Sequence, residues 1–305
     1  MLLCVECRGI QSVSADRQAW KLALGSLDGG AVRTLGRPVH TPDTSTIVRL
    51  SVITDEIDPK LERALDVCEE LGIDAVELRS LDQVQIVDLG PSDLRGIRAT
   101  LDRRGFVVSA IASPFMKCGR GEPQDAVLSA TLQAAKLLGA PIVRSFAYWR
   151  EGDVRAAMPD VGRVLHAAAE RAHHAGVTLA LENEHECNVA TSGEARAALA
   201  AAASPHLRLI WDPGNAAMLD PAVFAGLGGL EDIRGRVAHV HVKDVTMSQE
   251  WTRIGDGIVD FAALLRYLDE TRYDGYLSFE THYRRAGSGE LATRDCVAAL
   301  RELGA

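Results

Sequence analysis

The chain has 305 residues, of which 47% are apolar and 25% are charged, so it can build a large core and is not typical of a disordered protein. Its net charge of −9 argues against a protein that follows a nucleic-acid backbone, and no apolar run reaches the roughly 18 residues that cross a membrane. Its six cysteines are too sparse for a disulfide framework, which favours a reduced, cytoplasmic setting.

The first 47 residues differ from the rest of the chain. They show no clean helical or strand period and are rich in Gly, Ser and Thr. We therefore expect an irregular N-terminal extension over 1–47 and one catalytic domain over 48–305. Cys4 and Cys7 form a C-x-x-C pair, but no second pair accompanies them, so a zinc or redox role is the less favoured interpretation.

From residue 48 onward, strand-like apolar runs alternate with amphipathic helical segments. The predicted strands are 47–54, 74–80, 106–113, 141–148, 177–183, 207–212, 237–244 and 276–282. The predicted helices are 61–72, 93–105, 125–139, 160–176, 192–202, 221–229, 261–272 and about 15 residues at the C-terminal end. Eight strand–helix repeats predict an α/β fold, a (β/α)8 TIM barrel. A doubly wound open sheet is the alternative, but the first strand lacks the glycine-rich loop that such a sheet favours.

Four of these strands end in residues that bind metal ions: Glu182, Asp212, His241 and Glu280. Because the strand ends of a parallel barrel meet at one mouth, the four side chains are expected to converge. Three carboxylates and one imidazole suit a single divalent ion, Mn²⁺ first and Mg²⁺ or Co²⁺ next, better than structural zinc. Such an ion stabilises an enediolate, the intermediate of proton transfer beside a carbonyl.

The segments LENEH, WDPGN, HVHVKD and FETH, which carry these four residues, resemble the xylose isomerase-like barrel superfamily of sugar isomerases and epimerases. The resemblance covers about residues 48–303. It implies that the four residues hold one metal ion and that Glu182 and Glu280 also transfer the proton. It also implies a small carbohydrate substrate and a homo-oligomer.

Two positions depart from the ketose 3-epimerases of this superfamily. Asn188 stands where those enzymes carry a substrate-contacting Glu, and Met247 stands where they carry an Arg. The HVKDV segment instead resembles the inosose dehydratase branch. Its Lys243 has the parity of His241, and near a metal it could stabilise an oxyanion or act as acid or base, unless it is a solvated loop lysine.

Further residues follow the predicted strands and are candidates for the same mouth. His185 is a candidate acid or base, with a plain loop histidine as the alternative. Glu77 and Arg79 either pair with each other or hold a polar ligand. Arg144 either binds an anionic group or forms a salt bridge inside the barrel. The candidate substrate contacts are Asn215, His282, Arg144, Glu77, Trp149 and Trp251.

The favoured function is a metal-dependent isomerase or epimerase of a keto-sugar or keto-polyol. A lyase or dehydratase is the alternative, because the same enediolate can expel a β-hydroxyl. A non-catalytic sugar-binding barrel is less favoured. An abasic-site endonuclease is disfavoured because no histidine occurs between His40 and His166. The segment 255–257 is too acidic for a good phosphate nest, which favours a non-phosphorylated substrate.

Overall fold

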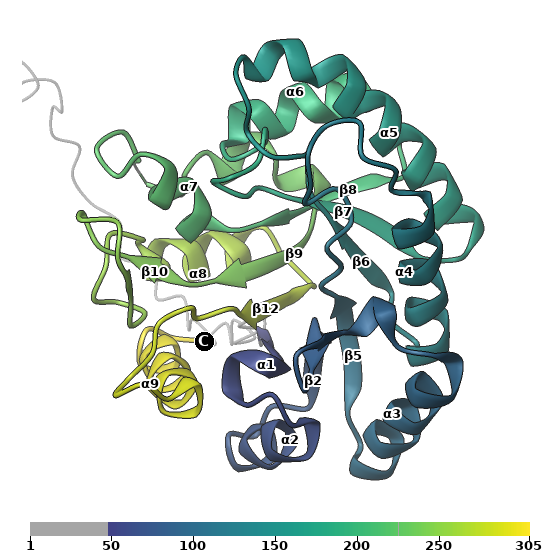
Figure 1. The fold of residues 1–305 in the computed structure, drawn as a ribbon. Coiled ribbons are helices and arrows are strands. Elements are labelled where there is room, and N and C mark those ends of the chain that lie inside the picture. The colour runs from purple at the N-terminus through teal and green to yellow at the C-terminus, as the bar shows by residue number, and fades with distance from the viewer. Residues whose placement is uncertain (1–47, 225) are drawn as a thin grey trace, which may run out of the picture. The chain divides into compact units, whose positions relative to one another are not determined.

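Eight parallel strands form a closed barrel in the computed structural model, which describes residues 48–224 and 226–305. The expectations for residues 1–47, including Cys4 and Cys7, lie outside these residues. In barrel order the strands are β1 (Arg49–Ile53), β2 (Ala75–Leu78), β5 (Val107–Ile111), β6 (Ile142–Ser145), β7 (Thr178–Glu182), β8 (Leu207–Trp211), β9 (Val237–Val242) and β12 (Tyr276–Phe279). Because β12 pairs with β1, the predicted TIM barrel is confirmed (Figure 1).

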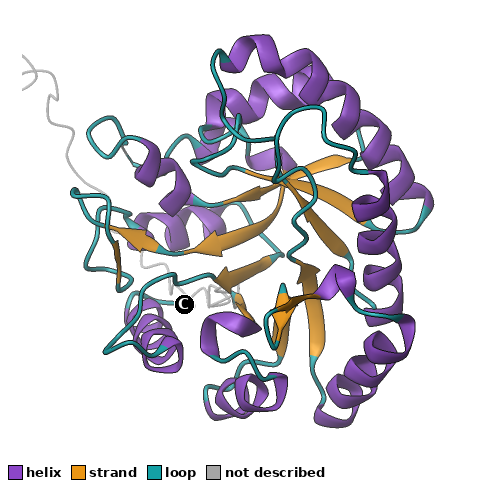
Figure 2. Ribbon diagram, viewed as in Figure 1, coloured by secondary structure: helices purple, strands orange, loops and turns teal. Residues whose placement is uncertain are grey.

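Helices surround these strands (Figure 2). They are α2 (Leu61–Glu70), α3 (Pro91–Arg104), α4 (Asp125–Leu138), α5 (Val154–His174), α6 (Ser192–Ala202), α8 (Phe261–Glu270) and α9 (Gly289–Glu302). The sequence marks their ends. Thr191 and Glu194 form a reciprocal capping box at the start of α6. Gly105 and Gly139 end α3 and α4 in the left-handed conformation that glycine adopts at low cost. None of the helices in the described ranges is long and apolar enough to span a membrane.

Several short elements follow the C-terminal ends of barrel strands and therefore surround the mouth. They are α1 (Thr54–Ile57), the hairpin of β3 (Ser80–Leu81) and β4 (Val84–Gln85), a 3-10 turn (Ile86–Asp88), α7 (Pro213–Leu219), and the hairpin of β10 (Asp244–Val245) and β11 (Trp251–Thr252). Two further 3-10 turns, Leu230–Asp232 and Arg234–Arg236, precede β9. These elements are too short to produce a periodic sequence pattern.

The helix predicted over 221–229 is wrong. The described residues of this stretch form turns, and Gly226, Gly228 and Gly229 have positive φ angles, which no right-handed helix contains. The helix after β8 is instead α7, which begins directly after Asp212. Its first turn has Pro213 at its start, and the Asp212 side chain caps it by accepting from the Asn215 backbone N–H.

The barrel interior is polar, and the apolar core lies between the strands and the helices. The Glu77 carboxylate on β2 contacts the His239 ring on β9, although two other strands separate β2 from β9 in the barrel order. This contact is possible only through the interior. The alternation of β9 therefore points His239 and His241 inward, while Val240 and Val242 are buried on the outer face.

Candidate metal centre

The four predicted ligands converge. Glu182 is the last residue of β7, Asp212 directly follows β8, His241 lies near the end of β9 and Glu280 directly follows β12. All four are buried, and each offers a ligand atom within 4.8 Å of the others. The position of each strand end in the closed barrel produces this convergence.

The His241 ring points one nitrogen at the three acidic ligands. Its Nδ1 lies 3.0 Å from Glu182 Oε1, 3.5 Å from Glu280 Oε2 and 4.0 Å from Asp212 Oδ2. Burial alone would lower the pKa of His241, but the charges of Glu77 and Glu182 outweigh it and raise the pKa well above its usual range. The metal-free cluster thus holds a proton that a metal ion has to displace.

The other nitrogen of this ring faces Glu77. His241 Nε2 lies 3.1 Å from Glu77 Oε2, and His239 Nε2 lies 2.9 Å from the same atom. The Glu77 side chain has no exposed surface. The pairing of Glu77 with Arg79 is therefore wrong, because Glu77 is taken up by two histidines across the barrel. Arg79 instead contacts Glu280 at 2.8 Å and Glu56 at 2.7 Å.

Two buried cations balance the carboxylates. Lys243 Nζ lies 2.7 Å from Glu280 Oε2 and 3.0 Å from Asp212 Oδ2, so its interpretation as a solvated loop lysine is wrong. Arg144 Nη1 lies 3.1 Å from Glu182 Oε2, and its other nitrogens donate to the backbone carbonyls of residues 112 and 113. Arg144 thus forms the salt bridge inside the barrel, and most of its donors are already used.

His185 and Asn215 lie next to each other beside the ligands. His185 Nδ1 lies 2.7 Å from Glu184 Oε1 and 3.2 Å from Asn215 Oδ1. Burial alone would lower the pKa of His185, but its hydrogen bond to Glu184 and that residue's charge raise it. Asn215 is fully buried, and its amide donates to Glu182 Oε1 and to the Asn183 carbonyl. Asn215 therefore positions a ligand carboxylate.

The predicted aromatic residues lie at the rim of the mouth. The Trp251 ring lies 5.4 Å from the His282 ring, 6.0 Å from the His185 ring and 5.1 Å from Lys243 Nζ. His282 in turn contacts Glu56 Oε1 at 3.1 Å. Trp149 lies elsewhere, 5.7 Å from Lys117 Nζ. Trp251 thus lies beside the ligand cluster, and Trp149 contacts Lys117, which lines the mouth cavity.

A small cavity opens next to the ligands, with a volume of about 200 Å³. It is lined by Arg79, Gln85, Pro114, Lys117, Arg144, Phe146, Glu184, Glu280 and His282. Glu280 connects it to the four-residue cluster. Lys117 and Glu184 form an ion pair of 2.9 Å in this wall, and neither is among the candidate residues predicted from the sequence. Glu184 could have been found, because it has the parity of Glu182 on the same strand end.

Asn188 is hydrogen-bonded to the protein backbone, and Met247 is exposed to solvent. The Asn188 side chain is buried and donates to the carbonyls of Ala147 and Trp149 at 2.9 and 3.0 Å. Met247 lies in the β10–β11 hairpin and is 63% exposed. Neither residue lines the mouth cavity, which agrees with the predicted departure from the ketose 3-epimerases.

The backbone N–H groups of Gly255 and Gly257, in the acidic loop 255–257, are bound by a carboxylate of the protein itself. Asp244 accepts hydrogen bonds from the backbone N–H groups of Gly255, Gly257 and Val259. A Cβ atom added at Gly257 would lie 2.1 Å from Asp244 Oδ1, so only glycine fits there. These donors are therefore not available to a phosphate group.

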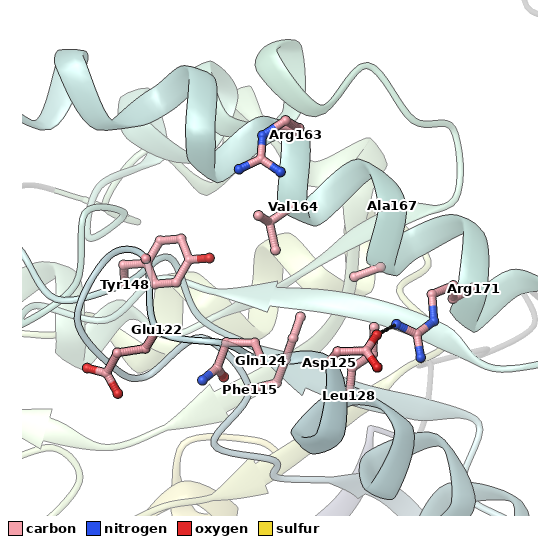
Figure 3. A pocket seen from close by; sticks show the side chains of 12 residues that line it. Phe115, Glu122, Gln124, Asp125, Leu128, Tyr148, Arg163, Val164, Ala167 and Arg171 are labelled. Atoms are coloured by element: carbon pink, nitrogen blue, oxygen red, sulfur yellow. Dashed lines mark hydrogen bonds and ion pairs between the residues drawn. The ribbon is translucent and has the colours of Figure 1, made fainter.

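A second cavity, of about 410 Å³, lies away from the ligand cluster between the loop after β5, α4 and α5 (Figure 3). Leu128 and Val164 face it, and Arg171 pairs with Asp125 at its edge. No cluster that could hold a metal lines it within residues 48–224 and 226–305.

The donor set fits one divalent ion. Asp212 Oδ2 is buried and, in the described part of the chain, has no hydrogen bond of good geometry; its ion-pair contacts are with Lys243 Nζ at 3.0 Å and His241 Nδ1 at 4.0 Å. Burial raises the pKa of Asp212 to about 6; Lys243 opposes this shift, while Glu182 and Glu280 add to it. A bound cation would satisfy this buried carboxylate oxygen, which lacks a well-aligned hydrogen bond and lies next to two further carboxylates.

Solved structures share this fold. An L-ribulose 3-epimerase is 21% identical over 84% of this chain and 96% of that chain, with a TM-score of 0.66. The IOLI protein with a zinc atom is 18% identical over 84% and 97% of the two chains, with a TM-score of 0.68. A probable 3-DHS dehydratase from Bacillus anthracis is 12% identical over 84% and 99%, also with a TM-score of 0.68. At these identities the likeness shows the fold alone.

The sequence also matches a family model. Among curated proteins, no match to this sequence is found. The family described as xylose isomerase-like TIM barrel matches residues 65–303, which is most of the chain and includes all four clustered ligands. The chain therefore belongs to the xylose isomerase-like TIM barrel family.

Proposed function

We propose that this protein is a metal-dependent isomerase or epimerase of a small carbohydrate with a carbonyl group. The observation that carries the proposal is the buried cluster of Glu182, Asp212, His241 and Glu280 beside a cavity of about 200 Å³. This volume is below the roughly 300–1,000 Å³ of pockets for drug-sized ligands, so a molecule of monosaccharide size suits it. An epimerase and a probable dehydratase on the same fold support this class of reaction.

One divalent ion, Mn²⁺ by the oxygen-rich donor set, would be held by these four residues and would supply charge stabilisation for an enediolate. Glu77 holds the His241 ring so that Nδ1 faces the cluster. Asn215 and Arg144 hold Glu182 from two sides at 3.3 and 3.1 Å. Because the IOLI structure contains a zinc atom, metal assays should include Zn²⁺ as well.

Glu280 is the carboxylate best placed to accept a proton from the substrate. It is the ligand residue that lines the cavity. Burial alone would raise its pKa, but Lys243, His282 and His241 hold the pKa well below its usual range, so the group is ionised. Because so low a pKa makes it a weak base, its role rests on its position in the cavity wall. Glu182, whose Oε1 lies 3.0 Å from His241 Nδ1, would return the proton in an isomerase or epimerase. His185 is a further candidate acid, because its hydrogen bond to Glu184 and that residue's charge outweigh burial and raise its pKa, which favours the protonated form.

A lyase or dehydratase is the second candidate, and Lys243 favours it. Its ammonium is buried beside two ligand carboxylates, where it could protonate a leaving hydroxyl or stabilise its charge. Elimination also agrees with the absence of the epimerase residues at Asn188 and Met247. The two reactions share the first proton abstraction and differ only in the fate of the enediolate.

Reaction in D₂O separates the two candidates. The Mn²⁺-loaded protein is incubated with keto-sugars and inososes, and the products are followed by NMR and mass spectrometry. Deuterium uptake without loss of water identifies an isomerase or epimerase, whereas loss of water identifies a lyase. A preparation that stays active after chelation and dialysis would overturn the proposed metal dependence.

A further inference from the structure

The wall of the mouth cavity carries more positive than negative side chains. Arg79, Lys117 and Arg144 line it together with the carboxylates of Glu184 and Glu280. Glu280 is also one of the four clustered ligands, so its charge is shared with the metal site. A neutral sugar has no need of such a wall, because hydroxyl groups bind well to uncharged donors and acceptors. A substrate with a negative charge would be favoured by a cation of this wall that keeps donors free of the protein's own carboxylates.

The three cations differ in the donors that they keep for a ligand. Arg144 donates three hydrogen bonds through its three nitrogens, to Glu182 and to the backbone carbonyls of residues 112 and 113, and it is almost buried. Arg79 donates to Asp55, Glu56 and Glu280 through all three of its nitrogens. Both guanidinium groups are therefore largely committed to carboxylates of the protein itself.

Lys117 is the cation with free capacity. Its Nζ makes one hydrogen bond, to Glu184 Oε2 at 2.9 Å, among the contacts of the described residues. An ammonium has three N–H donors, so two remain. The Lys117 side chain is 30% exposed, and Nζ lies 4.9 Å from the centre of the Phe146 ring and 5.7 Å from that of Trp149. The aromatic faces hold the charge at the cavity wall without using up its donors.

We propose that the substrate of this enzyme carries a carboxylate that binds Lys117, with its carbonyl end at Glu280 and the clustered ligands. This inference rests on the proposed function and names its substrate class: a keto acid of monosaccharide size. A carboxylate pairs with an ammonium through charge-assisted hydrogen bonds, and two N–H donors of Lys117 are free for it. A phosphate group is the poorer match, because it brings about two negative charges and three acceptor oxygens, whereas, among the described residues of the cavity wall, Lys117 is the one cation with most of its donors free.

Three ligands with one carbon skeleton test the charge. D-fructose, D-fructuronate and D-fructose 6-phosphate differ at C6 alone, which is a hydroxymethyl, a carboxylate or a phosphate ester. Binding of each to the Mn²⁺-loaded protein is measured by calorimetry. We expect D-fructuronate to bind at least about tenfold more tightly than D-fructose, the usual effect of one charge-assisted hydrogen bond. Equal binding of these two, or tighter binding of the phosphate ester, would overturn the proposal.

Two substitutions with opposite expected effects on D-fructuronate binding make the test specific. Lys117→Met removes the positive charge and should abolish the preference for D-fructuronate. Glu184→Gln removes the competing carboxylate and should strengthen D-fructuronate binding, because it leaves Lys117 without its ionic partner. A pair with a purely structural role would weaken binding in both variants, which contradicts the proposal. Lys136→Met, on the exposed face of α4, is the matched control and should change nothing.

The test of the carboxylate site can be separated from the tests of the proposed metal chemistry. Metal binding is measured by calorimetry with MnCl₂ alone, and proton exchange by NMR in D₂O. If neither is found but D-fructuronate still binds through Lys117, the metal chemistry fails and the carboxylate site stands. If both are found and the acid shows no Lys117-dependent preference, the carboxylate site fails and the metal chemistry stands.

Discussion

Glu77 Oε2 lies 3.1 Å from His241 Nε2, on the opposite side of the ring from the acidic ligands. Burial alone would raise the pKa of Glu77, but the charges of His241 and His239 hold it well below its usual range, so this carboxylate is ionised and can only accept. Nε2 therefore carries a proton, and Nδ1 is the nitrogen directed at the metal site. A residue from a strand that two other strands separate from β9 thus sets the tautomer of this candidate ligand.

Glu77→Gln is expected to weaken metal binding by about 10- to 100-fold, the usual effect of losing such a partner. The amide removes the charge that holds the imidazole in this tautomer. Calorimetric titration with MnCl₂ measures the change, and Glu151→Gln, an exposed residue of the loop before α5, is the control. Unchanged affinity in the Glu77 variant would show that the ring is positioned by packing instead.

Glu182→Gln and Glu280→Gln are each expected to reduce proton exchange by at least about 100-fold, the contribution of a positioned acid or base. The fold should survive, because glutamine has the same shape and its carbonyl can still accept from Arg144 or Arg79. Deuterium exchange measures activity, and circular dichroism checks the fold. Full exchange in either variant would remove that residue from the proton transfer. Exposed Glu270→Gln should behave as wild type.

Metal stabilisation should depend on pH through Asp212, whose pKa is raised by burial to about 6. In the metal-free protein, the stability that the protonated form contributes is fully present below about pH 4 and is lost as the pH rises through 6. A metal ion needs the ionised carboxylate, so its binding weakens as the pH falls through 6. The protonation of His241 acts in the same direction.

Thermal melts with and without MnCl₂ check this dependence. We expect the increase in Tm from the metal to be large at about pH 7.5 and small at about pH 5, because fewer ligands are ionised in acid. Asp93→Asn, an exposed carboxylate in the first turn of α3, is the control and should keep the same pH dependence. An equal gain in Tm at both pH values would contradict the assignment of Asp212 as a ligand.

The convergence of Glu182, Asp212, His241 and Glu280 could be predicted from the sequence because their signal is local. Each of the four ends a short apolar run, and the alternation of the strand sets the face of its side chain. The same alternation places Glu184 with Glu182 and His239 with His241. The roles of these neighbours could not be assigned, because their partners come from other strands of the closed barrel.

Contacts between distant segments account for what the sequence missed. Glu77 and Arg79 are two positions apart, which would let them face the same side and pair. Instead, Glu77 contacts the histidines of β9, and Arg79 contacts the carboxylates of α1. Lys117 lies in an irregular loop and meets Glu184 across 67 positions of sequence. The helix at 221–229 failed for a local reason, since its glycines take positive φ angles. Periodic patterns are thus informative for elements, whereas ion pairs depend on the closed fold.

Asn188 offers a test of stability apart from catalysis. Its amide donates to the carbonyls of Ala147 and Trp149 and so fixes the loop that places Trp149 beside Lys117. Asn188→Ala leaves these buried carbonyls without donors and should lower the free energy of unfolding by about 1–3 kcal/mol. Asn188→Asp should cost more, because it also buries a charge against the carbonyl oxygens.

Urea unfolding measures both variants, and Gln133→Glu on the exposed face of α4 controls for exchanging an amide for a carboxylate. The loss of stability should appear in the metal-free protein as well, because the bonds of Asn188 lie outside the ligand cluster. If either variant unfolds like wild type and changes substrate binding instead, Asn188 contacts the substrate after all. The hydrogen bonds of Asn188 to Ala147 and Trp149 favour a loss of stability over a change in substrate binding. Asn188→Glu removes the same bonds, so it should destabilise the loop and not create the substrate contact of the epimerases.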